Sequence, residues 1–473
     1  MLDVVAGIKA AAARNAYQPA LITEGRAIGY GDLLAAVARV SNDLAARRLP
    51  PLTRAVLEIA DPDLKVTVLV ACLHAGLVPF ALANPALRAD LGPHIVIADA
   101  PPGAAAADIH LDPRLVEGRA GDSVLRELPD RSPSDPLFLG ATSGTTGRPK
   151  LVAELRGVHA SRTDQAGMQY FEPGERVMFS VGAATVVGIT FVLRMLSLGA
   201  TNVRQADPET SVRLINLTRV RHWRGTPGAI GDMMDAMEKA GAKCPTVRRM
   251  VLFGSLFPVA LVERIERNFD AELVVSYGSA ESGRVTWDRI DSRSFEPGYV
   301  GRLLPDVELL AAGTPAEPAQ LVIGNPRTGF RPYVEGGRIA APETRRALPD
   351  VGYAVGDRLY LVGRDDEVIN INGVKTAFST VERVLRALPG VRDVAVVGGG
   401  ALGEPSTLIV GVTGAPTLAL DELKKALLVT ALPPRAEANL RLFRLDRVPR
   451  NVTGKVDRDA VVRAWRESLP GRG

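Results

Sequence analysis

The chain has 473 residues, of which 46% are hydrophobic and 23% charged, with 46 glycines and 34 prolines. This length exceeds one ordinary core, so two or three domains are expected, and the composition excludes an intrinsically disordered protein. The 57 Lys and Arg residues nearly balance the 53 Asp and Glu residues, and the sequence has no long basic run, which argues against a nucleic-acid partner.

Residues 66–83 form the one stretch that is long and apolar enough to raise the question of a membrane span. His74, Gly76 and Pro79 interrupt it. A buried helix that ends near Gly76, followed by a strand at 78–82, explains the same residues, because glycine is a common helix stop signal. We therefore expect no membrane span.

The first two thirds of the chain alternate helix-like and strand-like segments. Residues 31–47 and 258–268 have the spacing of apolar residues that is typical of amphipathic helices. Short apolar runs predict strands at 55–59, 94–98, 137–139, 176–181, 250–253 and 273–276. This alternation indicates parallel α/β layers.

Beyond residue 300 the pattern changes. Residues 300–362 contain short strand-like runs with many glycines and prolines, as in a small β-rich subdomain. From about residue 365 we expect helices at 380–388, 420–431 and 458–468, and strands at 393–397, 408–412 and 440–445. The fold class is therefore α/β. A large N-terminal domain, residues 1–364, would consist of layered α/β subdomains with the β-rich subdomain, and a small α+β domain would occupy residues 365–473.

Cysteine and histidine spacing argues against a redox or zinc site. Cys72 and Cys244 lie far apart, and no two of the five histidines stand four residues apart. Reduced structural thiols are typical of a cytoplasmic protein. The N-terminus lacks a basic head followed by a long apolar stretch, so we expect no signal peptide and a cytoplasmic location.

Residues 142–150, Thr-Ser-Gly-Thr-Thr-Gly-Arg-Pro-Lys, are the most informative segment and follow the strand at 137–139. Two glycines permit close backbone approach, while the hydroxyls and the final lysine suit phosphate oxygens. The candidates for nucleotide binding here are Thr142, Ser143, Gly144, Thr145, Thr146, Gly147 and Lys150. The spacing is not that of a Walker A loop, and on composition alone a surface turn is the alternative.

Four segments in this order resemble the adenylate-forming superfamily of acyl-CoA synthetases, peptide-synthetase adenylation domains and luciferases. They are residues 142–150, Tyr-Gly-Ser-Ala-Glu at 277–281, the Gly-Asp and Gly-Arg pairs within 356–364, and Pro-Arg-Asn-Val-Thr-Gly-Lys-Val-Asp-Arg at 449–458. The resemblance covers roughly residues 20 to 465. It implies ATP and Mg²⁺ as cofactors and a C-terminal domain that is mobile.

The resemblance also implies roles for single residues. Lys455 would be the catalytic lysine that bridges the carboxylate and the phosphoryl oxygens, and Glu281 would bind Mg²⁺ and complete the catalytic site. Asp357 would accept the ribose hydroxyls, and Arg364 would help at the ribose or the phosphates. The residues expected around the adenine are Gly254, Ser255, Tyr277 and Gly278.

By the same resemblance, two further positions would serve the transfer of the acyl group to a thiol. Asp366 matches the hinge about which the C-terminal domain swings, and Gly373 would line the approach of the thiol. The thiol would belong to CoA or, as an alternative, to the phosphopantetheine of an acyl carrier protein. Ala280 replaces the usual threonine and Asn370 the common lysine, so a catalytically impaired nucleotide-binding module is a second alternative.

The segment at 179–188 bears on the substrate. Amino-acid-activating members hold the amine with an aspartate there, and this sequence has no acidic residue in the segment, which disfavours an α-amino acid. The histidine of many acyl-CoA-forming relatives is missing as well. Apolar residues at 186–193 suit a fatty or aryl acid, although a core helix explains them equally well. We expect an acid–thiol ligase that forms an acyl-adenylate and then a thioester.

Overall fold

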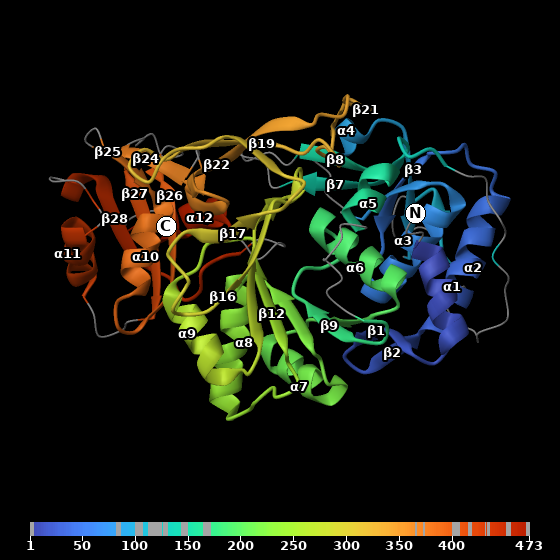
Figure 1. The fold of residues 1–473 in the computed structure, drawn as a ribbon, viewed down its shortest axis with the longest axis horizontal. Coiled ribbons are helices and arrows are strands. Elements are labelled where there is room, and N and C mark those ends of the chain that lie inside the picture. The colour runs from blue at the N-terminus through green and yellow to red at the C-terminus, as the bar shows by residue number, and fades with distance from the viewer. Residues whose placement is uncertain are drawn as a thin grey trace.

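The fold was obtained as a computed structural model of the chain. The structure describes residues 4–81, 87–99, 107–111, 125, 131–142, 150–163, 172–364, 367–371, 374–399, 407–414, 419–430, 432, 436–450 and 456–469. In Figure 1 the N-terminal helices lie at the right and the C-terminal elements, in orange and red, at the left, with two large sheets between them.

The larger sheet has 13 strands. Its parallel part consists of β13 (Glu272–Ser276), β12 (Arg249–Phe253), β11 (His222–Gly225), β9 (Arg176–Phe179), β10 (Thr201–Arg204) and β1 (Pro19–Thr23), with β2 (Arg26–Gly29) antiparallel at the edge. An antiparallel part continues from β13 through β16 (Thr286–Ile290), β17 (Tyr299–Leu303), β23 (Arg358–Arg364), β22 (Arg345–Val355), β19 (Ala319–Gly324) and β18 (Glu308–Ala311). Most of the strands in the region expected to form a β-rich subdomain thus extend the parallel sheet.

A second sheet has eight strands. They are, in order, β21 (Arg338–Ile339), β20 (Tyr333–Glu335), β8 (Lys150–Leu155), β7 (Pro136–Thr142), β4 (Val78–Phe80), β3 (Arg54–Glu58), β5 (His94–Ala98) and β6 (Ile109–His110). β20 comes from the region beyond residue 300, so this sheet joins distant parts of the chain.

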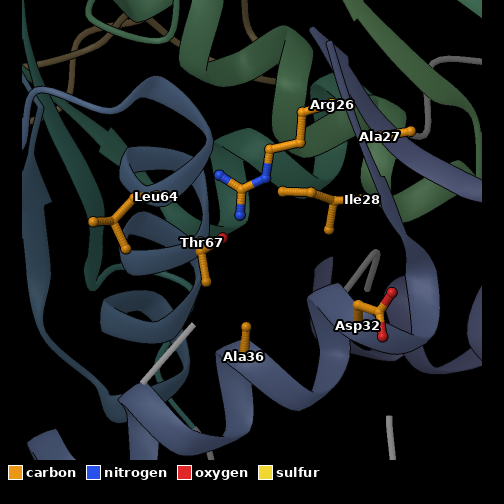
Figure 2. A pocket seen from close by; sticks show the side chains of 7 residues that line it. All are labelled: Arg26, Ala27, Ile28, Asp32, Ala36, Leu64 and Thr67. Carbon is orange, nitrogen blue, oxygen red and sulfur yellow. The ribbon is translucent and has the colours of Figure 1, made fainter. Parts of the chain in front are cut away.

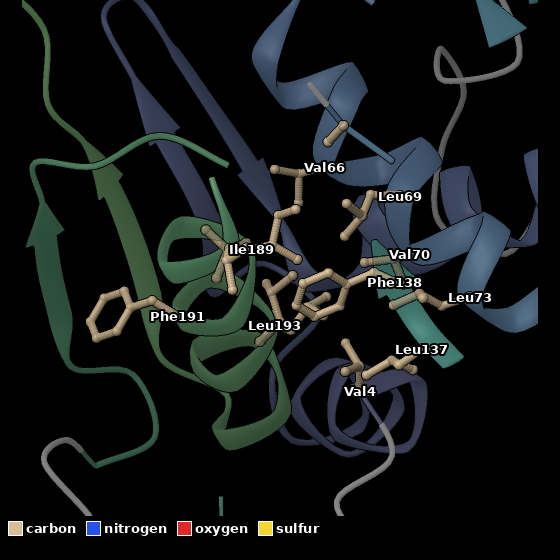
Figure 3. Packing of buried hydrophobic residues seen from close by; sticks show 14 of the residues in the cluster. Val4, Val66, Leu69, Val70, Leu73, Leu137, Phe138, Ile189, Phe191 and Leu193 are labelled. Carbon is tan, nitrogen blue, oxygen red and sulfur yellow. The ribbon is translucent and has the colours of Figure 1, made fainter. Parts of the chain in front are cut away.

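The main core contains helices that pack against the second sheet. Figure 3 shows apolar side chains of α1 (Val4–Arg14), α3 (Pro62–Ala75), α6 (Val186–Leu198) and β7 turned toward one another. α2 (Tyr30–Ala46) packs beside α3. A second core lies between the parallel strands and α7 (Pro208–Thr218), α8 (Pro227–Ala240) and α9 (Val259–Asn268). The predicted layered α/β fold is confirmed.

The described part of the apolar stretch, residues 66–81, contains a buried helix and a strand, as predicted. Asp61 caps α3 by accepting hydrogen bonds of 2.8 Å from two backbone N–H groups. The helix ends at Gly76, whose φ of 79° is favourable for glycine, and β4 follows. In the part of the chain that the structure describes, no helix has both the length and the apolar character to cross a bilayer.

The described residues from 367 to 469 form a unit with its own core, called here the C-terminal unit. Its elements are β24 (Val368–Ile371), β25 (Val374–Ala377), α10 (Phe378–Arg386), β26 (Val391–Gly398), β27 (Leu408–Gly414), α11 (Leu420–Thr430), β28 (Leu440–Arg444) and α12 (Arg458–Ser468). The three helices and three strands predicted for this region are confirmed to within two residues at each end.

Candidate active site

A cavity of about 1890 Å³ lies between the larger sheet and the C-terminal unit. Ligands of open α/β sheets bind outside the carboxyl ends of the strands, and residues that follow β12 and β13 line this cavity. The residues predicted from sequence that line it are Thr142, Gly254, Ser255, Tyr277, Gly278 and Glu281. Segments separated by more than 100 residues therefore contribute to one space.

The expected phosphate-binding segment opens on this cavity. Thr142 ends β7 and is paired in register with Lys150, the first residue of β8. Residues 143–149, which include Ser143, Gly144, Thr145, Thr146 and Gly147, lie outside the described residues. The hydroxyl of Thr142 is buried and has no hydrogen-bond partner among the described residues. The two ends of the segment therefore lie side by side, with a polar group at the cavity wall.

Glu281 lies at the tip of a small hairpin formed by β14 (Gly278–Ser279) and β15 (Gly283–Arg284). The tip is held at each residue. Arg331 donates from Nη1 to the carbonyl of Ala280 at 2.6 Å and from its backbone N–H to the carbonyl of Glu281 at 2.9 Å. Arg162 donates to the carbonyl of Ser282 at 2.9 Å. The Glu281 carboxylate therefore projects from a fixed backbone.

Another part of the wall combines a glycine and two polar side chains. Gly254 has a φ of 92°, a conformation that strongly favours glycine, so the chain can turn sharply after β12. The ring of Phe253, which precedes Gly254, stacks on Phe179 at 5.4 Å. The Tyr277 hydroxyl donates to the carboxylate of Asp350 at 2.5 Å, and both residues line the cavity.

One part of the cavity wall is mostly apolar. Val181, Thr185, Val186 and Val187 line it, and all four belong to the segment singled out for substrate selection. Thr185 caps α6 by accepting a hydrogen bond of 3.0 Å from a backbone N–H group. The start of α6 therefore presents apolar side chains and no acidic group to the cavity, whereas Ile189 and Leu193 lie in the main core, as expected from the alternative of a core helix.

The C-terminal unit contributes the opposite side of the cavity. Arg450 and Val456 line the cavity and form a bridge with one another. Lys455 lies between them in residues 451–455, which are outside the described residues. Both ends of the predicted catalytic-lysine segment therefore lie at the cavity.

A second cavity, of about 190 Å³, is lined by side chains of β2, α2 and α3 (Figure 2). Arg26, Asp32 and Thr67 are its polar residues, and Ile28 and Leu64 are among its apolar ones. No described residue lines both cavities. The volume of this second cavity is below the range of roughly 300–1,000 Å³ that is typical of ligand pockets. The larger cavity is therefore the candidate active site.

Comparison with known proteins identifies the family. Residues 8–324 match the AMP-binding enzyme family. The chain belongs to this family. It is 25% identical to a 4-chlorobenzoate–CoA ligase of Arthrobacter sp, over 92% of this chain and 89% of that protein. It is 27% identical to an L-proline–[L-prolyl-carrier protein] ligase of Pseudomonas fluorescens, over 72% and 71%.

The fold is also that of a solved AMP-binding enzyme. The O-succinylbenzoate CoA synthetase of Bacillus subtilis, in complex with ATP and a magnesium ion, superposes with a TM-score of 0.76 at 18% identity, over 96% of this chain and 99% of that one. The expected superfamily, its α/β fold and its character as an AMP-forming acid–thiol ligase are confirmed.

The geometry around Glu281 fits Mg²⁺ bound with a nucleotide. Among the described residues, no group of three or more His, Cys, Asp or Glu side chains could hold a metal alone. Mg²⁺ is usually bound through one or two carboxylates together with substrate phosphates. A single carboxylate that shares a cavity with the ends of the phosphate-binding segment meets that description.

Two predicted site residues whose side chains the structure describes, Lys150 and Asp357, do not line the cavity of this AMP-binding enzyme. Lys150 Nζ lies 5.2 Å from the centroid of the Tyr333 ring. Asp357 is the other. It lies in the turn between β22 and β23, and its side chain is 57% exposed and bonded to Arg302 at 2.6 Å. Asp350, in β22, lines the cavity instead. Asp357 lies seven positions after Asp350, five of them in β22 and two in the turn, and the strand part alone spans about 17 Å. The Gly-Asp dipeptide directed the prediction to a hairpin turn, and no local motif marks Asp350.

Four other positions lie in or near the gaps at 365–366 and 372–373, which are outside the described residues. Arg364 ends β23, where its backbone pairs with Asp350, so it lies close to the cavity wall. Asp366 and Gly373 lie outside the described residues. Asn370 lies in β24 and pairs with Lys375. The proposed hinge and thiol approach therefore stay predictions.

Proposed function

We propose that this enzyme uses ATP and Mg²⁺ to convert a carboxylic acid to an acyl-adenylate, and then transfers the acyl group to the thiol of CoA. The observation that carries the proposal is one cavity that is lined by Glu281, by Thr142 at the start of the phosphate-binding segment and by both residues that flank the Lys455 segment. Each supplies one requirement of the reaction: a metal ligand, phosphate donors and a cation.

In the first half-reaction, a carboxylate oxygen forms a bond to the α-phosphorus as the bond to pyrophosphate breaks. Bound Mg²⁺ would neutralise phosphate charge. Thr142 and Lys150 would orient the phosphates, because a buried hydroxyl and a cation flank residues 143–149. Lys455 would stabilise the charge that develops on the reacting oxygens, which is an electrostatic contribution made in the transition state.

We assign the ribose contact to Asp350. An ionised carboxylate can accept hydrogen bonds from both ribose hydroxyls. Asp350 lines the cavity, and the Tyr277 hydroxyl orients its carboxylate. Tyr277 and Gly278, with Gly254 and Ser255 opposite, would enclose the adenine. Arg364 follows in the strand paired with Asp350 and would act at the same end of the nucleotide.

The acid is proposed to be a fatty or aryl acid rather than an α-amino acid. The lining residues Val181, Val186 and Val187 are apolar and offer no carboxylate for an amine. Ala280 does not argue strongly for an impaired site, because Arg331 holds its carbonyl oxygen and the hairpin is built without the threonine hydroxyl.

The acceptor thiol has two candidate sources, since relatives act on CoA and on a carrier protein. We prefer CoA because the match to the CoA ligase covers more of this chain, 92% against 72%. Thioester formed from the purified acyl-adenylate with CoA, and not with holo-carrier protein, is the expected result. Thioester on the carrier alone would overturn this choice.

The proposal is tested first by ATP–pyrophosphate exchange with Mg²⁺ against fatty, aryl, hydroxy and amino acids. Exchange stimulated by fatty or aryl acids is expected. Exchange with amino acids alone would overturn the proposed substrate class. Silence across the panel, with ATP binding intact and a control ligase active, would favour a nucleotide-binding module without catalysis.

A further inference from the structure

Four charged or titratable side chains form a buried cluster behind the Glu281 hairpin. Glu154 of β8 is bonded to the Arg331 guanidinium, and its carboxylate lies 3.5 Å from Arg162 Nη1 and 3.3 Å from His159 Nδ1. The four side chains are at most 10% exposed. In this Glu154 cluster, His159 and Arg162 belong to α5 (Arg156–Thr163), which follows β8, and Arg331 belongs to the segment before β20.

A buried carboxylate needs compensation, and here the compensation is specific. Burial alone would raise the pKa of Glu154, but Arg331, His159 and Arg162 together lower it to about 2. Glu154 is therefore ionised at neutral pH. An ionised, hydrogen-bonded carboxylate fixes its partners strongly, because the surrounding protein screens the charges far less than water does.

Both arginines of the cluster also donate a hydrogen bond to the hairpin tip. Arg331 binds the carbonyl of Ala280 at 2.6 Å, and Arg162 binds the carbonyl of Ser282 at 2.9 Å. These are the residues immediately before and after Glu281. Arg162 also binds the carbonyl of Gly329 at 2.9 Å, which ties the segment leading to Arg331 to the same centre.

The anchor of the cluster stands on the strand that starts with Lys150. Side chains at every second position of a strand share a face, so Lys150 and Glu154 belong to the same face of β8. β8 pairs with β7, which ends at Thr142. One carboxylate therefore links the strands that carry the phosphate-binding segment to both sides of the metal-binding residue.

We propose that Glu154 is a positioning residue: by holding Arg162 and Arg331, it sets the place of Glu281 relative to the phosphate-binding segment. The inference rests on the proposed role of Glu281 in binding Mg²⁺ with ATP. A role in stability alone would lower the melting temperature and leave metal-dependent nucleotide affinity unchanged. The two roles therefore differ in a measurable quantity.

The test is calorimetric binding of ATP to the whole enzyme without acid substrate, once with Mg²⁺ and once with EDTA. Glu154→Gln keeps the size of the side chain and removes its charge. We expect the affinity gained from Mg²⁺ to fall about tenfold or more, as on loss of partners that orient metal ligands, with binding in EDTA changed by less than about twofold. In a Glu281→Gln background, Glu154→Gln should have no further effect on the Mg²⁺ gain.

Glu175→Gln is the matched control. Glu175 is another carboxylate of low exposure, 13%, paired with His222 at 2.9 Å. It precedes β9 and so lies at the amino end of the parallel strands, opposite the cavity. The substitution should lower stability and leave the Mg²⁺ gain intact. An equal loss of the gain in Glu175→Gln would overturn the proposal.

The remaining outcomes are also decisive. A full Mg²⁺ gain in folded Glu154→Gln would overturn the role of Glu154 and leave the proposed function standing. A wild-type enzyme whose ATP affinity ignores Mg²⁺, or a Glu281→Gln variant that keeps the gain, would overturn the role of Glu281 and this inference with it. If Glu154→Gln does not fold, Arg162→Lys replaces it: a loss of about threefold or more in the Mg²⁺ gain supports the proposal, and an unchanged gain overturns it.

Discussion

Two groups of charged residues lie near the candidate active site, and they differ in exposure. The Glu154 cluster lies behind the Glu281 hairpin and does not line the cavity, whereas the second group lines it from the C-terminal unit. The side chains of the Glu154 cluster are 0–10% exposed and join segments within the large N-terminal part. In the C-terminal unit, Asp393 bonds Arg386 and Arg450, and Arg386 also bonds Glu382. These side chains are 14–24% exposed and all line the cavity.

The difference separates parts that are held from parts that can rearrange. Breaking a fully buried ion pair leaves an uncompensated charge, whereas a partly exposed pair can exchange its partner for water at a smaller cost. The buried Glu154 cluster holds the backbone on both sides of the proposed metal ligand, and the partly exposed group around Asp393 flanks the Lys455 segment. This is the arrangement expected of a site whose nucleotide half is preorganised and whose catalytic lysine belongs to a unit that moves.

Disrupting the Glu154 cluster should have the largest effect on the free energy of unfolding. Glu154→Gln is expected to lower the free energy of unfolding by about 3–5 kcal/mol at pH 7, because three cationic or titratable partners lose their shared anion. Urea denaturation with circular dichroism measures the loss. A loss below about 1 kcal/mol would show that the cluster is no tighter than a surface ion pair.

The same variant predicts a pH dependence. Because the pKa of Glu154 is lowered to about 2 in the fold, its contribution is fully present above the unfolded pKa of about 4.3 and is lost as the pH falls toward 2. The stability difference between wild type and Glu154→Gln should therefore shrink between these two values and stay constant from pH 5 to 7. A difference that widened in acid would contradict the assigned charge state.

Removal of Lys455 should lower catalysis without lowering the affinity for ATP. Lys455→Ala is expected to lower acid-stimulated ATP–pyrophosphate exchange by about 10²–10³-fold, as for other groups that stabilise charge in the transition state. ATP affinity should change by less than about twofold, because the proposed nucleotide contacts lie outside the C-terminal unit. Unchanged exchange would defeat the catalytic assignment, and a parallel loss of ATP affinity would place the lysine on the binding side.

Substitutions of Asp350 and Asp357 test which of the two carboxylates binds the ribose. Asp350→Asn should weaken ATP binding by about tenfold or more, since hydrogen bonds to a charged group are the strong ones. Asp357→Asn changes an exposed turn residue and should alter ATP affinity by less than about twofold. Calorimetric titration of both variants decides. The reverse order of effects would restore the ribose contact to the Gly-Asp turn.

The sequence predicted what is local and missed what depends on long-range pairing. Periodicity located α2, α9 and the elements of the C-terminal unit, and glycine at 76 marked the end of α3. Motifs found the residues around the cavity because each motif is a short run. Asp350 escaped, since its place at the cavity depends on the register of β22 and β23. Glu154 escaped too, because its main partner is 177 residues away.

Disrupting the partly exposed group around Asp393 should have the smallest effect on the free energy of unfolding. Asp393→Asn keeps an acceptor oxygen but removes the negative charge that Arg386 and Arg450 share; the two arginine side chains are 23% and 24% exposed. We expect a loss of about 0.5–1 kcal/mol in unfolding free energy at low salt, and less in 0.5 M NaCl, since salt screens accessible charges; this salt concentration is of the order that cuts the Debye length to a few ångströms. The penalty of Glu154→Gln should keep its size in the same salt, because the buried pair is screened far less. A large, salt-independent loss in Asp393→Asn would mean that the C-terminal group is locked as firmly as the Glu154 cluster, and that the lysine-bearing side is not the one built to rearrange.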